Sequence, residues 1–151
     1  MFQGNFSNTL DDKGRVAIPA RFRDALAASG DDKLMMTIFE LSGVPCLEAY
    51  SYQTWQELNS ALQATRGSFS QNRLLFETVY IGSVQQCQPD KQGRVLIPQT
   101  QRTYAELDGD VTFVGAGKKF QIFSASGHAK VVGAFRSLLR ENPDFFHDLG
   151  I

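Results

Sequence analysis

The sequence predicts an α+β protein, mainly β with added helices, that consists of two pseudo-symmetric halves. Three observations support this fold class: an internal repeat without gaps, short apolar segments between glycine-rich turns, and amphipathic segments of helical length. The chain has 151 residues, of which 42% are hydrophobic and 21% are charged. This balance is typical of globular proteins, and the length suffices to bury a core without disulfides.

The internal repeat aligns residues 11–19, DDKGRVAIP, with residues 90–98, DKQGRVLIP, at an offset of 79 residues. At the same offset Arg23 aligns with Arg102. The apolar pattern of the first half returns in the second, in the paired segments 34–39 with 111–114 and 46–51 with 119–124. Each half therefore predicts the order strand, turn, strand, short helix, strand, hairpin turn, strand and helix.

Each copy of the repeat begins with a turn and continues as a strand. Asp11 and Gly14 favour the first turn, because a carboxylate accepts from nearby backbone N–H groups and glycine adopts positive φ. Val16 and Ile18 then recur with the period of a half-buried strand. If these β-branched side chains face inward, Arg15 faces outward, and the second copy behaves in the same way.

Proline ends each of these strands and begins a short helix, at Pro19 and at Pro98. The side chains expected to pack inward from the two helices are Phe22, Leu26, Tyr104 and Leu107. Glycine-rich breaks at residues 43–45 and 115–118 predict the hairpin loops.

Two further helices are expected between the halves. Residues 52–65 carry apolar side chains at helical spacing, and Gly67 and Ser68 interrupt that pattern. Residues 70–81 predict a second helix with Ser70 as its cap, although residues 78–81 fit a strand equally well. The chain is therefore divided into a first repeat, a helical connector, a second repeat, and a C-terminal helix with a tail, at residues 1–52, 53–80, 81–124 and 125–151.

Several functional classes are not expected. The N-terminus lacks a secretory signal and no apolar segment approaches the ~20 residues that span a bilayer, so we expect a cytoplasmic protein with no membrane partner. Cys46 and Cys87 lie far apart and predict two buried thiols. His128 and His147 lack paired ligands at metal spacing. With no activated nucleophile either, the sequence predicts a protein that is not an enzyme and uses no metal or cofactor.

The net charge of −1 argues, taken alone, against nucleic-acid binding. The basic residues are concentrated in the repeat, however. Between residues 11 and 23 four basic residues oppose two acids, and between residues 90 and 102 three oppose one. Acidic residues lie elsewhere, notably in the tail. The repeat is therefore the segment that favours a polyanionic partner.

The two Gly-Arg-Val-x-Ile-Pro segments have two interpretations. In the first, each arginine only bridges to the turn aspartate four residues earlier, Arg15 to Asp11 and Arg94 to Asp90. In the second, the arginine binds phosphate or reads guanine, the glycine allows close approach of DNA, and the aspartate orients the arginine. The presence of two copies favours the second interpretation.

These residues resemble the MraZ family, bacterial regulators made of two tandem AbrB-like (SpoVT-AbrB) domains. The resemblance covers nearly the whole chain and rests on the opening Met1-Phe2-x-Gly4 and on the two Asp-x-x-x-Arg segments, Asp11 to Arg15 and Asp90 to Arg94. It implies a swapped-hairpin β-barrel formed by both halves and a homo-oligomeric ring, an octamer or a dodecamer. It also implies a nucleoid-associated protein that binds double-stranded DNA at direct repeats in the promoter of its own cell-division and cell-wall operon.

The resemblance also implies which residues bind DNA. The assigned contacts are Lys13, Gly14 and Arg15 in the first half and Lys91, Gly93 and Arg94 in the second, with Asp11 and Asp90 as orienting residues. Arg23 and Arg102 occupy a position where AbrB-like proteins often carry a second basic contact. Because Gln92 replaces the lysine of the first loop, the two loops are not chemically equivalent.

Two other classes of protein remain open. An antitoxin-like binder shares the AbrB-type barrel but normally adds a long disordered segment, and a structural or enzyme-regulating oligomer would have no DNA role. The tail, residues 140–151, combines Phe145 and Phe146 with acidic residues. Its aromatic side chains either dock on the body of the same chain or contact a neighbouring subunit.

Overall fold

The computed structural model describes residues 1–30, 32–65 and 70–151. The first half contains β1 (Asn5–Thr9), β2 (Arg15–Ala17), α1 (Ala20–Ala28), β3 (Leu34–Leu41) and β4 (Val44–Ser51). The second half repeats this order as β5 (Gln85–Cys87), β6 (Arg94–Leu96), α4 (Gln99–Tyr104), β7 (Asp110–Gly115) and β8 (Phe120–Ser124). The other helices are α2 (Tyr52–Ala64), α3 (Gln71–Phe76), the π-helical η1 (Glu77–Ile81), α5 (Ala125–Glu141) and α6 (Phe145–Asp148). The predicted α+β class and the duplicated order of elements are confirmed.

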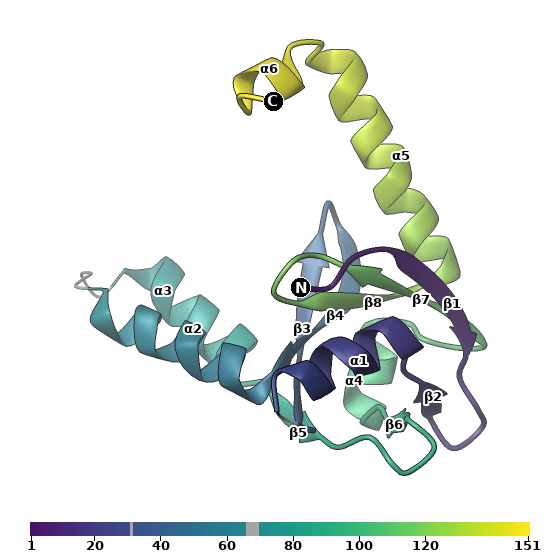
Figure 1. Ribbon diagram of the computed structural model, residues 1–151. Coiled ribbons are helices and arrows are strands. Elements are labelled where there is room, and N and C mark those ends of the chain that lie inside the picture. Colours follow the sequence, from purple (N-terminus) through teal and green to yellow (C-terminus); the bar gives the residue numbers. More distant parts are fainter. Residues whose placement is uncertain (31, 66–69) are drawn as a thin grey trace.

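The strands of the two halves interleave in one antiparallel sheet (Figure 1). Its order is β1-β7-β8-β4-β3-β5, so β1 of the first half pairs with β7 of the second, and β5 of the second half pairs with β3 of the first. At the centre β4 pairs with β8, and Glu48 lies opposite Gln121. Each half therefore completes the sheet of the other.

The two repeat segments pair with each other in a separate ribbon of β2 and β6. Val16 lies opposite Val95 at the centre of the ribbon. Just beyond it, the Ile18 N–H donates to Gly93 O and the Ile97 N–H donates to Gly14 O, both at 2.9 Å. All four β-branched side chains of the ribbon are buried, whereas its two arginines remain partly exposed. The predicted inward and outward faces are therefore confirmed.

Aromatic rings fill the core between α1 and the sheet. Phe22 of α1 is buried, and its ring centroid lies 5.0 Å from that of Phe120 and 5.4 Å from that of Phe2. Phe113 completes the cluster from β7, 6.5 Å from Phe22. Such aromatic pairs add packing energy to the burial of apolar area. Leu26 is buried as well, so the predicted inward face of α1 is confirmed.

The equivalent helix of the second half packs differently. Leu107 is buried as predicted, but the prediction for Tyr104 is wrong, because its side chain is 36% exposed. Gln101 takes the inward position instead, and its Nε2 donates to Met36 O (2.9 Å) and to Ser83 O (3.1 Å). The helix is only six residues long, and the face that carries Gln101 and Ala105 is the one that meets the core. Tyr104 lies outside this face and is exposed.

The connector is helical at residues 53–64 and 71–80. Ser51 caps α2 by accepting from the Thr54 N–H at 3.1 Å, and Ser70 caps α3 by accepting from the Arg73 N–H at 3.1 Å. Residues 77–81 continue α3 as a π-helical turn, so the alternative of a strand is wrong. The predicted break at residues 67–68 lies outside the described residues.

One hairpin loop is shorter than predicted. Ser42 and Gly43 form the turn between β3 and β4, both with positive φ, whereas Val44 and Pro45 belong to β4. A proline is tolerated there because the segment of β4 that pairs with β8 begins only at Leu47.

The C-terminal helices form an arm that extends from the body (Figure 1). Phe145 of α6 packs against Phe135 of α5, with ring centroids 6.1 Å apart, and Phe146 is 49% exposed. The interpretation that both aromatics dock on the body is therefore wrong, because they meet α5 or solvent. None of the helices in the described part of the chain has the length and apolarity that a membrane span requires.

Candidate nucleic-acid interface

The first turn is built around the carboxylate of Asp11. Its Oδ1 accepts from the backbone N–H groups of Lys13 (2.9 Å) and Arg15 (2.8 Å), and its Oδ2 accepts from Arg15 Nε (2.9 Å). The Asp11 N–H donates to Arg15 O (2.8 Å), and the Gly14 N–H donates to Asp11 O (3.1 Å). The carboxylate therefore ties the arginine side chain to the turn that precedes it.

The second turn repeats these contacts around Asp90. Its Oδ1 accepts from the N–H groups of Gln92 and Arg94, both at 2.9 Å, and its Oδ2 accepts from Arg94 Nε at 3.0 Å. One contact has no counterpart in the first turn: Arg94 Nη2 also donates to Gln92 Oε1 at 3.2 Å. Lys13 occupies that position in the first turn and offers no acceptor.

The hydrogen bonds of the turns lower the pKa of both aspartates. For Asp11 the main cause is the backbone N–H of Arg15, and for Asp90 it is the backbone N–H of Arg94. Both carboxylates are therefore charged at neutral pH and form ion pairs with their arginines. These side chains are 33–36% exposed, so the pairs stabilise the fold little and mainly fix geometry.

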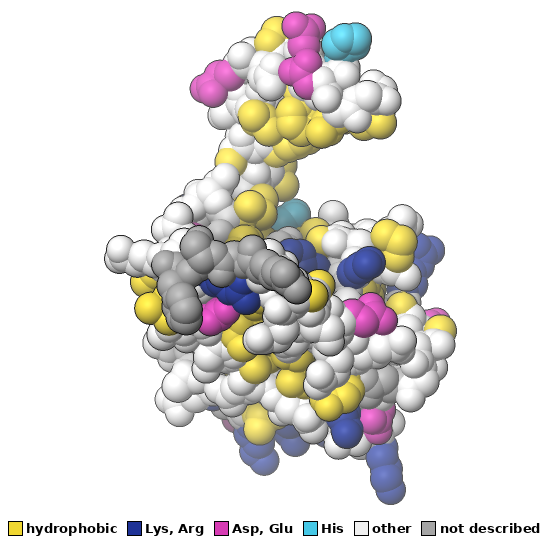
Figure 2. Space-filling view, turned by 90° about the vertical axis from the view of Figure 1, so that its left-hand side faces the viewer, with side chains coloured by type: hydrophobic (Ala, Val, Ile, Leu, Met, Phe, Trp, Pro, Cys, Tyr) yellow, Lys and Arg dark blue, Asp and Glu magenta, His cyan; other side chains and the backbone are white. Residues whose placement is uncertain are grey.

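The β2–β6 ribbon brings both turns to one edge of the molecule, at the bottom of Figure 1. Figure 2 shows lysine and arginine side chains projecting from this edge. Basic side chains of a protein whose net charge is only −1 are thus gathered where two matching turns meet. Such an edge suits a polyanion better than the net charge of −1 suggests.

The glycines of the turns have positive φ, 85° at Gly14 and 76° at Gly93. The space beside each glycine is filled by an arginine of the opposite half. A Cβ at Gly14 would lie 1.2 Å from Nη1 of Arg102, and a Cβ at Gly93 would lie 2.5 Å from Nη1 of Arg23. Arg102 Nη1 also donates to Lys13 O at 3.2 Å. The two arginines therefore lie at the turns, each at the turn of the other half.

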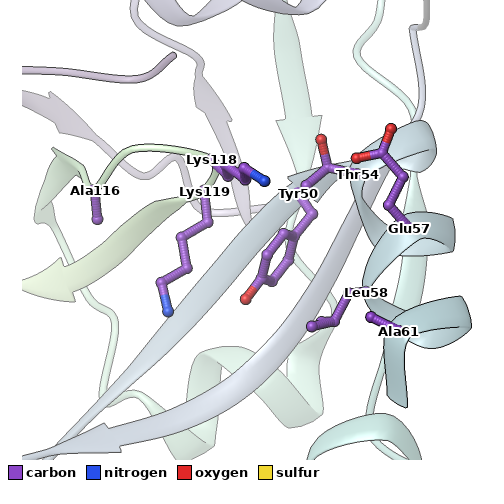
Figure 3. Close-up of a pocket in the computed structure, with 8 residues that line it drawn as sticks. All are labelled: Tyr50, Thr54, Glu57, Leu58, Ala61, Ala116, Lys118 and Lys119. Carbon is purple, nitrogen blue, oxygen red and sulfur yellow. The ribbon is translucent and has the colours of Figure 1, made fainter. Parts of the chain in front are cut away.

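A second polar cluster lies away from this edge, beside a cavity of about 590 Å³ between α2 and the β7–β8 hairpin (Figure 3). Buried Glu48 accepts from Lys119 Nζ (2.8 Å), Gln121 Nε2 (2.9 Å) and the Tyr80 hydroxyl (2.6 Å). Tyr50 completes the cluster through a hydrogen bond between the two tyrosine hydroxyls (2.7 Å). All five side chains have partners, so the cluster serves to join the sheet to η1.

Burial and hydrogen bonding to Glu48 together shift the pKa values of interior groups. Burial, together with the hydrogen bond to Glu48, raises the pKa of Tyr80. Burial alone would lower the pKa of Lys119, but the hydrogen bond and charge of Glu48 raise it. Burial raises the pKa of Cys46 to about 12 and that of Cys87 to about 11.

The two cysteines are free and buried, as predicted. A thiol with a raised pKa is protonated and unreactive at neutral pH. Within residues 1–30, 32–65 and 70–151, no group of three or more histidine, cysteine, aspartate or glutamate side chains is placed to hold a metal ion. Among the described residues, the arginine turns are therefore the strongest candidate for a functional site.

Comparison with known proteins identifies the family. The family described as "MraZ protein, putative antitoxin-like" matches residues 1–76 and 81–143. The chain belongs to the MraZ family. The two matched stretches contain both arginine turns and the strands of both halves, and the second stretch ends before α6.

Several similar proteins carry the name "Transcriptional regulator MraZ". The MraZ protein of Azoarcus sp. is 38% identical over 143 residues, which are 95% of this chain and 93% of that protein. The MraZ protein of Saccharophagus degradans is 38% identical over 124 residues, 82% of each chain. That of Desulforapulum autotrophicum is 36% identical over 124 residues, 82% of this chain and 80% of that protein.

Proposed function

We propose that this chain is a sequence-specific, DNA-binding transcriptional regulator, most simply a repressor of its own cell-division and cell-wall operon. The names of its MraZ relatives support a role in transcription. The observation that carries the proposal is the pair of matching arginine turns at one edge of the molecule. Direct repeats in the promoter are the proposed target, and the proposed location is the nucleoid within the cytoplasm.

Each arginine turn is proposed to contact DNA in the same basic way. The aspartate binds Nε, which leaves terminal guanidinium nitrogens to donate to guanine O6 and N7 or to phosphate oxygens. Lys13 and Lys91 are exposed and supply point charges for phosphates. Gly14 and Gly93 give the turns their shape. Asp11 and Asp90 act as orienting residues and not as catalytic acids.

We also propose that the subunits form a ring of eight or twelve copies. Two separate apolar surfaces support assembly. The first, on α3 and η1, exposes Leu74, Leu75, Phe76 and Val79. The second, on the arm of α5 and α6, exposes Val132, Phe135, Leu138, Phe146 and Leu149. Contacts between two different surfaces of neighbouring copies generate a ring when their rotation closes.

Assembly would supply the affinity that one subunit lacks. A single subunit neutralises only a few phosphates and should bind weakly. Turns from adjacent subunits, spaced to match direct repeats, can raise avidity by ~10²–10⁴. Within each subunit we retain the description of a swapped-hairpin barrel, because β1 and β5 each pair with a strand of the other half. We also retain the division at residues 1–52, 53–80, 81–124 and 125–151.

The proposal is tested by a salt series on duplex DNA. Fluorescence anisotropy would follow binding to a duplex from upstream of the protein's own gene and to a random duplex of equal length. We expect the logarithm of the affinity to fall linearly with the logarithm of the salt concentration, and the upstream duplex to bind more tightly. Absence of salt-dependent binding to either duplex would favour an oligomer without a DNA role.

An antitoxin-like function is kept as the second candidate because the matching family is described in those words. Purification of the full chain from its own host distinguishes the two functions. A small toxin that copurifies in stoichiometric amounts and releases the DNA would favour the antitoxin. DNA binding unaffected by any copurified protein supports the regulator alone.

A further inference from the structure

Arg23 and Arg102 contact the arginine turns from the opposite half of the chain. Arg102 lies on α4, in the second half, yet its Nη1 donates to Lys13 O in the first turn at 3.2 Å. Arg23 lies on α1, in the first half, and its guanidinium covers Gly93 of the second turn. The internal repeat relates the two arginines to each other and the two glycines to each other. The contact is therefore reciprocal.

We propose that Arg23 and Arg102 are positioning residues, each of which holds the DNA-contacting turn of the other half. Each turn is then a joint product of both halves, because the arginine that supports it comes from the opposite half. This inference rests on the proposed function of the turns in DNA binding. It gives the two arginines a role different from that of a second phosphate contact.

The space into which a side chain would project from each glycine is already occupied by an arginine of the opposite half. Both glycines are buried, and a Cβ at either would collide with the guanidinium of the opposite half. A planar guanidinium can lie flat against a turn and still donate in its own plane. An ammonium group on a flexible stem cannot do both. The contact therefore requires glycine in the turn and arginine on the opposing helix.

The alternative role is a direct phosphate contact. In the part of the chain that the structure describes, neither Arg23 nor Arg102 forms an ion pair with a carboxylate, so no acidic side chain offsets the charge of either. Charge alone would make them attractive to phosphate. The two roles predict different results for substitution by lysine, which keeps the charge but loses the planar contact.

The first test needs no DNA. Amide hydrogen exchange would be measured on the full-length free protein and on Arg102→Lys and Arg102→Gln. We expect faster exchange at Arg15 and at Ile97, whose N–H groups are bonded to Asp11 and to Gly14 O, and unchanged exchange at Arg94. Arg23→Lys should loosen the second turn and leave Arg15 unchanged. Unchanged exchange in both turns for all three variants would overturn the proposal.

The second test measures affinity for the upstream duplex across a salt series. If Arg102 positions the turn, the lysine and glutamine variants both lose roughly tenfold in affinity, as expected for a hydrogen bond to a charged group. The salt dependence of the lysine variant stays at its wild-type slope. If Arg102 binds phosphate, the lysine variant keeps wild-type affinity and the glutamine variant loses ~0.9 in slope. That second result would overturn the proposal.

A double-mutant cycle identifies the turn on which Arg102 acts. Combining Arg102→Lys with Arg15→Ala should give a non-additive loss, because both changes disable the first turn. Combining Arg102→Lys with Arg94→Ala should be additive. The reverse pattern contradicts the proposal. If Arg15→Ala itself has no effect on DNA affinity, the proposed function fails, while the hydrogen-exchange result still decides whether the arginines hold the turns.

Discussion

At equivalent positions in the two halves, α1 buries Phe22 and α4 buries Gln101. The phenylalanine joins an aromatic cluster, whereas the glutamine donates to backbone carbonyls of Met36 and Ser83. The first helix has nine residues and its counterpart has six. The halves therefore diverge where the second half meets the connector. There Gln101 of α4 bonds to Ser83 O, in the segment that follows η1.

The turns, in contrast, have kept nearly the same geometry in both halves. The three contacts of Asp11 and those of Asp90 agree within 0.1 Å. Among the described residues they differ in two contacts: Arg94 donates to Gln92 in the second turn, and Arg102 donates to Lys13 O in the first. The comparison teaches that a duplicated protein can change its supporting core while the edge proposed to bind DNA keeps its geometry. Four predictions test this difference, from the largest expected effect to the smallest.

The largest effect is expected at the centre of the sheet, where the halves carry Glu48 and Gln121. Glu48→Gln leaves Lys119 without its ion pair and should lower the free energy of unfolding by about 2–3 kcal/mol. This is less than the ~3–5 kcal/mol of a fully buried pair, because the Lys119 side chain is 30% exposed. Gln121→Met removes one hydrogen bond and should cost about 1 kcal/mol. Urea denaturation measures both, and equal losses would contradict this difference.

The next effect concerns the two arginines of the turns. Arg15→Ala should weaken binding to the upstream duplex by about 1–3 kcal/mol, if the guanidinium reads a base. Arg94→Ala should cost less, because Gln92 already accepts from one of its terminal nitrogens. Lys130→Ala, exposed on α5, is the matched control and should bind as the wild type does. Gel-shift titration provides the measurement, and a larger loss for Arg94→Ala than for Arg15→Ala would reverse the proposed ranking.

A smaller effect is expected when the second turn is converted to the first. Gln92→Lys removes the acceptor of Arg94 Nη2 and adds one cation to the edge. Affinity should rise, and the slope of log affinity against log salt should steepen by about 0.9 for each phosphate gained. The reciprocal variant Lys13→Gln should weaken binding. If neither variant changes the slope, position 13 and its counterpart do not contact phosphate.

The smallest effect is that of pH on the turns. Hydrogen bonding in the folded state lowers the pKa of both aspartates below the ordinary value of 3.8. The stability that they contribute is therefore present above that value and is lost as pH falls through the lower, folded-state pKa. Between pH 5 and 8 neither turn should change. NMR titration of the two carboxyl groups provides the check, and a midpoint above 3.8 for either would contradict the hydrogen bonding described here.

Much of the fold could be predicted because its signals are local. The turn residues Asp11 and Gly14 and the alternation of Val16 with Ile18 depend only on neighbours in the sequence. Alignment of the internal repeat then predicted the same elements in the second half. Both turns, their outward arginines and the order of strands and helices followed from these signals.

The sequence could not show which side chains of one half contact the other half. An alignment of Arg23 with Arg102 indicates equivalence, but their position at the opposite turn arises from the pairing of β2 with β6. The burial of Gln101 in place of Tyr104 depends on the length and tilt of a six-residue helix. The position of Glu48 inside the apolar segment CLEAY indicates a buried charge that needs a partner. Its partners could not be predicted, because Tyr80 comes from η1 and Gln121 from β8.

The interleaved strand pairing has a consequence for synthesis of the chain. β1 and β2 leave the ribosome first, but their partners β7 and β6 follow only with the second half. Until then the nascent first half has unpaired strand edges, and folding must wait for contacts of high sequence separation. Two fragments cut within the connector should therefore fold only when mixed.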